Sequence, residues 1–174
     1  ITACALALWN KTVGKSRKGI LGSVAFAATA LALGLASTGW TKNTSTLSGL
    51  FLVDSFSVFF KCILLLITGL TILISKRFLT IEDADRGEYY ALILLATFGM
   101  LIMVSSGDVL TMYLGLETMA ISSYILAAYF RSDERSSEAG LKYFLLGALN
   151  SGIILYGLAL LYGIAGSLSL PDIR

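Results

Sequence analysis

Histidine is absent from the 174-residue sequence, and proline occurs only once, as Pro171. The lack of histidine excludes a Ser–His–Asp triad and removes the commonest metal ligand and neutral-pH proton carrier. The two cysteines, Cys4 and Cys62, lie in apolar segments without metal-ligand spacing, so we interpret them as small hydrophobic residues. The 17 glycines are scattered and form no GxGxxG or Walker pattern, which argues against a Gly-rich nucleotide-binding loop.

Charge is also scarce. Charged residues make up 14% of the sequence, whereas soluble domains carry about 25%. Hydrophobic residues make up 56%, which places the chain in the membrane class. The net charge is +2 and no basic tract is interleaved with aromatic residues, so the sequence gives no indication of a nucleic-acid partner.

Apolar runs of about 20 residues, the length that spans a bilayer core, recur along the chain. They predict an all-α fold: a polytopic membrane helix bundle that forms a single membrane domain over residues 1–174, with six transmembrane segments, the first of them partial. The expected segments lie at about residues 1–9, 19–40, 53–75, 89–107, 109–130 and 139–165. The sequence begins without Met on what resembles the tail of a helix. We interpret it as a truncated chain, a processed product or one half of a split protein.

The loops between these segments differ in charge. If all six segments span the membrane, one side receives nine basic residues and the other side only two, Lys42 and Arg174. Basic loops face the cytoplasm, or the matrix in a mitochondrion. A wrong helix count would have mixed the two sets of loops, so the asymmetry supports the predicted number of spans.

Glu117 stands in the middle of an apolar stretch, MYLGLETMAISSYI. It follows Asp108 by nine residues, which at ~1.5 Å per residue places it about 14 Å deep, near the midplane of a ~30 Å core. Such a carboxylate must be protonated, paired or exposed to water inside a bundle. We favour a functional proton relay over a neutral carboxylic acid that only bonds a neighbouring helix.

Four residues share the side of Glu117 by helical spacing: Tyr113, Ala120, Ile121 and Tyr124. The tyrosine hydroxyls could line a water chain, but ordinary aromatic packing is the favoured interpretation.

Other polar residues of the apolar segments have structural interpretations. Lys61 is expected to extend its amino group to the membrane surface, and Lys142 could do the same or take part in function. Asp54 and Asp108 are expected to cap the helices that follow them. The small residues Gly147 and Ser151, with Asn150 beside them, suggest a helix-packing notch.

Two stretches together resemble a known family. LTMYLGLETMAISSYILAAY, followed by RSSEAGLKYFLLGALNSGIILYGLALLYGIAGSLSL, is similar to subunit 2 (chain N) of NADH:ubiquinone oxidoreductase, respiratory complex I. The resemblance covers roughly residues 50–170 and is strongest over 113–166. It implies an antiporter-like proton-pumping subunit in which Glu117 is the central channel carboxylate and Lys142 lies near the proton path. The chain stops before the helix that carries the family's partner lysine.

The resemblance also implies a setting. It places the chain in the mitochondrial inner membrane, or alternatively in the bacterial inner membrane, among other membrane-arm subunits and lipid. If the subunit is split, a second chain with the remaining helices is a further expected partner. The complex as a whole uses NADH, FMN, iron–sulfur clusters and ubiquinone. This chain is expected to bind none of these groups and to perform no redox chemistry itself.

Two alternative functions remain open. One is a purely structural membrane-arm subunit. The other is a related cation/proton antiporter or membrane hydrogenase subunit, for which Trp is usual at the position of Leu116.

Overall fold

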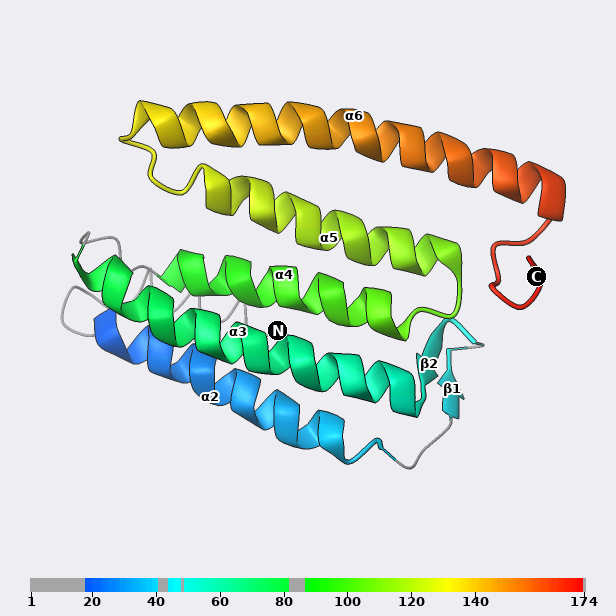
Figure 1. Cartoon of the computed structure of the whole chain (residues 1–174), viewed down its shortest axis with the longest axis horizontal. Helices are drawn as coiled ribbons and strands as arrows, with labels where there is room; N and C mark the ends of the chain where they lie inside the picture. The colour runs from blue at the N-terminus through cyan, green and yellow to red at the C-terminus, as the bar shows by residue number, and fades with distance from the viewer. Residues whose placement is uncertain (1–17, 41–43, 48, 82–86, 174) are drawn as a thin grey trace.

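The computed structural model describes residues 18–40, 44–47, 49–81 and 87–173. Most of these residues lie in long antiparallel helices that run side by side (Figure 1). The helices are α2 (Lys18–Ser37), α3 (Ser55–Ile81), α4 (Gly87–Ser105), α5 (Val109–Ala127) and α6 (Glu134–Ala165). A short antiparallel hairpin of β1 (Thr44–Thr46) and β2 (Phe51–Val53) joins α2 to α3.

The all-α membrane architecture is confirmed. In the described part of the chain, five helices are long and apolar enough to cross a membrane. The expected segment at residues 1–9 lies outside the described residues. The expected segments 53–75 and 139–165 are shorter than α3 and α6, because α3 ends and α6 begins with charged helical turns that lie outside the apolar runs. The β1–β2 hairpin was not predicted.

The two ends of the bundle differ in their connections. At the end that is poor in basic residues, backbone hydrogen bonds join three segments that are far apart in sequence. The Gly107 N–H donates to the Leu50 carbonyl, the Leu170 N–H donates to the Gly107 carbonyl, and the Val109 N–H donates to the Leu168 carbonyl. The hairpin, the α4–α5 turn and the segment after α6 therefore meet at one end (Figure 1).

The opposite end of the bundle carries the basic residues of the described loops and helix ends. Of the described basic residues, Lys76 and Arg77 lie in the last turns of α3, Arg131 in the α5–α6 loop and Arg135 in the first turn of α6. All four lie at the end of the bundle opposite the hairpin (Figure 1). The alternation of loops deduced from sequence thus holds for α2 to α6.

Helices α4 and α5 make a backbone-to-backbone contact at two buried glycines. A Cβ built on Gly99 would lie 2.5 Å from the Gly115 carbonyl oxygen, and one built on Gly115 would lie 2.7 Å from the Gly99 carbonyl oxygen. Both distances are too short for any side chain. Close approach at small residues is how membrane helices gain packing energy, since lipid offers little hydrophobic drive for association.

The apolar interior of the bundle lies where α2, α3 and α4 meet. Tyr90, Ile72 and Ala25 are fully buried there. Between α3 and α4 the buried hydroxyls of Thr68 and Thr97 are 2.9 Å apart. The core thus orders α4, and α4 in turn positions α5 through the glycine contact.

Each predicted N-cap is present. The Asp108 carboxylate accepts a hydrogen bond from the Thr111 N–H at the start of α5, and the Asp54 carboxylate accepts one from the Ser57 N–H at the start of α3. The Asp54 N–H donates back to the Ser57 hydroxyl, so the contact is reciprocal. Hydrogen bonds from Ser57, chiefly from its backbone N–H, hold the pKa of Asp54 below its ordinary value of 3.8.

The glycine contact predicts opposite effects for two Gly→Ala changes. Gly115→Ala forces α4 and α5 apart and should destabilise the protein by about 1–3 kcal/mol. Gly152→Ala on α6 should be neutral or stabilising, because its Cβ meets nothing within 4 Å and Ala favours helix. Thermal unfolding of the purified protein in detergent measures both. Equal midpoints for the two variants would contradict the packing described.

The Asp54 cap predicts an acid-dependent loss of stability. Because folding lowers the pKa of Asp54, its carboxylate stabilises the folded state above pH 3.8, and this contribution disappears as the pH falls through the folded-state value. Asp54→Asn, which retains a capping oxygen without a titrating proton, should therefore show a flatter decline of stability in acid. Unfolding measured from about pH 6 to pH 2 compares the two proteins, and superimposable curves would refute the assignment.

Candidate functional site

Glu117 lies at the middle of its helix. It is the ninth of the 19 residues of α5 and follows Gly115 by two positions. Two positions correspond to about 200° around a helix, so Gly115 turns toward α4 while Glu117 turns toward α6. The Glu117 side chain is half-buried at this α5–α6 contact.

Ser151 of α6 is the hydrogen-bond partner of Glu117. Its hydroxyl donates to Oε1 of the carboxyl group at 2.5 Å. The Tyr113 hydroxyl, one helical turn before Glu117, lies 3.5 Å from the Ser151 backbone carbonyl and also interacts with the Glu117 side chain. Three polar groups from two helices therefore converge near the middle of the predicted membrane span.

The predicted packing notch on α6 is present. Gly147 faces the ring of Tyr124, which occupies the space that a side chain at position 147 would need. Tyr124 also packs edge-on against Tyr143 and Phe144, with ring centroids 4.7 and 6.0 Å apart. The favoured interpretation of Tyr124 as a packing residue agrees with this geometry, whereas Tyr113 contacts the carboxyl group.

The same face of α6 continues toward the basic end of the bundle. Gly140 is buried against Ala128, whose Cα would lie 3.0 Å from a Cβ at position 140. The Ser136 hydroxyl donates to the Ala127 carbonyl. Small residues at positions 136, 140 and 147 thus let α6 approach α5 closely, and they bring Ser151 within reach of Glu117.

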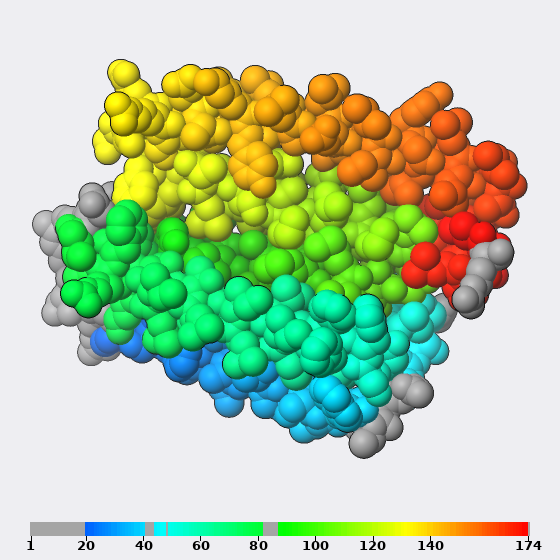
Figure 2. Space-filling view, in the orientation of Figure 1, coloured from blue at the N-terminus to red at the C-terminus, as the bar shows by residue number. Residues whose placement is uncertain are grey.

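Lys142 does not meet Glu117 in this structure. It precedes Ser151 by nine residues, or about 2.5 helical turns, and so lies on the opposite face of α6. Its amino group pairs with Glu138 one turn earlier, and the two side chains are 70% and 63% exposed. The large apolar side chains of α6 are exposed as well, and the helix forms one edge of the molecule (Figure 2).

Lys61 belongs to the other end of the bundle. It lies in register with Ser57 and Leu65 on the buried side of α3, is half-buried, and interacts electrostatically with Asp54. This geometry matches an amino group directed toward its nearer membrane surface. Lys61 has no described contact with Glu117.

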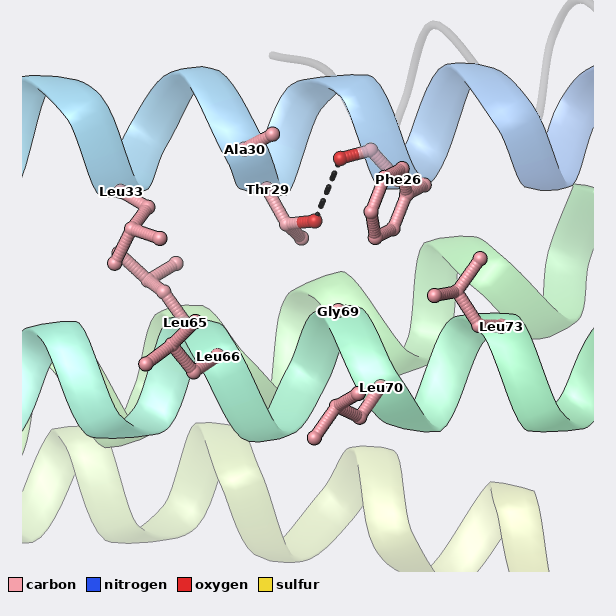
Figure 3. A pocket seen from close by; sticks show the side chains of 9 residues that line it. All are labelled: Phe26, Thr29, Ala30, Leu33, Leu65, Leu66, Gly69, Leu70 and Leu73. Atoms are coloured by element: carbon pink, nitrogen blue, oxygen red, sulfur yellow. Dashed lines mark hydrogen bonds between the residues drawn. The ribbon is translucent and has the colours of Figure 1, made fainter.

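A groove of about 170 Å³ lies between α2 and α3, away from the α5–α6 contact. Figure 3 shows Phe26 and Thr29 of α2 above Gly69 of α3, where the missing side chain opens the space. The lining has no ionisable residue, and the Thr29 hydroxyl donates to the Phe26 carbonyl. The groove is therefore not part of the site around Glu117.

A pair of cysteine substitutions tests the orientation of α6. In a background with Cys4 and Cys62 replaced, Ala127→Cys with Ser136→Cys should be joined by a short thiol-specific cross-linker, because the Ser136 hydroxyl reaches the Ala127 carbonyl. Ala128→Cys with Lys142→Cys should not, since Lys142 lies on the exposed face. Gel mobility of a chain cut within the α5–α6 loop measures the linkage. Efficient linkage of the second pair alone would show that α6 is rotated.

Helices long and apolar enough to span a membrane, with a carboxyl group at the middle of one of them, define a polytopic membrane protein with a polar site between its helices. Residues 106–174 match the family model of the NADH:quinone oxidoreductase/Mrp antiporter transmembrane region. The chain belongs to this family of respiratory-complex and antiporter membrane subunits, and its many relatives are named NADH-quinone oxidoreductase subunit N.

Two relatives show the extent of the similarity. The chain is 42% identical to NADH-quinone oxidoreductase subunit N of Trichlorobacter lovleyi over 167 residues, which are 96% of this chain and 34% of that protein. It is also 42% identical to subunit N of Erythrobacter litoralis over 179 residues, covering 100% of this chain and 37% of the relative. The chain therefore spans about a third of the length of these relatives.

A solved structure shares the fold. A chain of the membrane-bound sulfane sulfur reductase, an archaeal respiratory membrane complex, superimposes with a TM-score of 0.79 at 26% sequence identity. The match covers 99% of this chain and 37% of that chain. The arrangement of α2 to α6 thus occurs within a larger subunit of a respiratory complex.

Proposed function

We propose that this chain is part of a proton-translocating membrane-arm subunit of respiratory complex I, with Glu117 as a proton-carrying group. The observation that carries the proposal is a carboxyl group at the middle of α5 that is held by polar groups of a second helix. Placing a carboxylate at this depth costs several kcal/mol, so such groups are retained mainly for function.

The family relationship supports the reaction class. The named relatives are subunits of NADH-quinone oxidoreductase, and the structural neighbour belongs to another respiratory membrane complex. In this proposal the redox groups lie in other subunits, and quinone reduction drives proton transfer through charges that interact electrostatically. Membrane lipid and neighbouring membrane-arm subunits are the partners.

Lys142 has a separate place in the proposal. Because it lies on the α6 face away from Ser151 and is exposed, it would serve a step of the proton path beyond α6 and not exchange a proton with Glu117 directly. Its ion pair with Glu138 supplies a compensating charge at the basic end of the helix.

The membrane of residence also belongs to this proposal. The named relatives are bacterial proteins, which favours the bacterial inner membrane that the sequence left as an alternative. The mitochondrial inner membrane stays a prediction. In either membrane the end with Arg131 and Arg135 would face the cytoplasm or matrix.

The alternative functions are less well supported. A purely structural subunit would have no need of a carboxyl group at the midplane, where an apolar residue packs at lower cost. A cation/proton antiporter falls within the matched family description. The relatives named as subunit N, however, favour the respiratory complex over the antiporter.

Glu117→Gln tests the function. It keeps the size and the hydrogen-bonding oxygen of Glu117 but cannot release a proton, so quinone-coupled proton pumping of the complete complex in closed vesicles should fall about tenfold or more. The level of assembled complex should be unchanged. Glu134→Gln, which removes an exposed carboxylate from the first turn of α6, is the matched control and should pump normally.

Two results would contradict the proposal. Full pumping by Glu117→Gln would exclude an essential carboxyl group at this position. Loss of assembled complex, with normal pumping per remaining complex, would assign Glu117 a structural role instead.

A further inference from the structure

The Ser151 hydroxyl behaves differently from most other hydroxyl groups in these helices. In α3, α4 and α5, eight hydroxyl side chains donate to the backbone carbonyl four residues earlier in the same helix. These are Thr68, Thr71, Thr80, Thr97, Ser105, Thr118, Ser122 and Ser123. Ser151 instead donates across the helix interface to Glu117.

The same local bond is open to Ser151, since the carbonyl four residues earlier belongs to Gly147. A serine hydroxyl has one proton to donate and two lone pairs to accept with. When Glu117 is ionised, Ser151 can donate to it. When Glu117 is protonated, the Ser151 oxygen can accept a hydrogen bond from the carboxylic O–H. The Ser151 hydroxyl can then donate to the Gly147 carbonyl, four residues earlier, in the way that the eight other hydroxyls donate within their own helices.

We propose that Ser151 is the positioning residue that keeps the Glu117 carboxyl group hydrogen-bonded across the helix interface and thereby influences its proton affinity. Its hydroxyl changes between donor and acceptor as Glu117 loses and gains a proton. This inference rests on the proposed function only for its effect on pumping. The contact itself can be tested independently of transport.

The remaining titratable groups around Glu117 leave this assignment to Ser151. On α5 they are Tyr113 and Tyr124. On α6, Tyr143 packs against Tyr124, and Lys142 points away. The titratable residues of α4 are Glu88, Tyr89 and Tyr90, and all three lie at its beginning. They precede Gly99, where α4 contacts α5, by about 2.5 to 3 helical turns. Among the described residues, no basic side chain is recorded in contact with Glu117.

The experiment uses the complete complex and follows the Glu117 carboxyl group by infrared difference spectroscopy as a function of pH. The band that is absent from Glu117→Gln identifies the protonated carboxyl group. In Ser151→Ala the pH at half-titration should rise by about one unit, since a hydrogen bond to a charged group stabilises the ionised form by about that amount. The pH profile of proton pumping should move in the same direction.

Matched variants separate the hydroxyl from packing. Ser151→Thr retains the hydroxyl and should titrate as the wild type does. Ser151→Cys is close to serine in size but is a weak donor, so it should behave as Ser151→Ala. Ser123→Ala removes a hydroxyl that donates to the Met119 carbonyl of its own helix and should leave the titration unchanged.

Each outcome decides the question. An unchanged titration in both Ser151→Ala and Ser151→Cys overturns the inference, as does an equal shift in the Ser123→Ala control. A shifted titration together with normal pumping by Glu117→Gln supports the contact but refutes the proposed function. An unchanged titration together with failed pumping by Glu117→Gln refutes only the role of Ser151.

Discussion

The contact of α4 and α5 at Gly99 and Gly115 fixes the orientation on which the rest of the site depends. Two backbones meet there without side chains between them, so α5 cannot rotate without a clash. Glu117, two residues after Gly115, is thereby turned away from α4 and toward α6. A bulkier residue at position 115 would change the direction in which the carboxyl group points even if the helix itself still formed.

The face of α6 that contacts α5 supplies a hydrogen-bond donor to the carboxyl group at the midplane. An unpaired carboxylate there is costly, and hydrogen-bond donors reduce that cost. Small residues at positions 140 and 147 let α6 approach α5 closely enough for the Ser151 hydroxyl and the Glu117 oxygen to meet. Close packing and hydrogen bonding of the Glu117 carboxyl group are therefore achieved by the same stripe of residues.

Most of the fold could be predicted from the sequence, because lipid requires helices whose length and apolarity are easily recognised. Glu117 could be found for the same reason, as a charge within an apolar run. Ser151 could not be separated from the packing notch at Gly147, since serine serves both roles and only the rotation of α6 about its axis distinguishes them. The orientation of Lys142 and the β1–β2 hairpin likewise depend on tertiary contacts that hydropathy does not encode.

Helix α6 is held near both of its ends. Ser136 and Gly140 hold it to the end of α5, and beyond its other end the Leu168 carbonyl accepts the Val109 N–H. The helix is therefore supported at two points, and Ser151 lies about midway between them. Support at both ends resists tilting of α6, and it keeps the Ser151 hydroxyl beside the Glu117 carboxyl group.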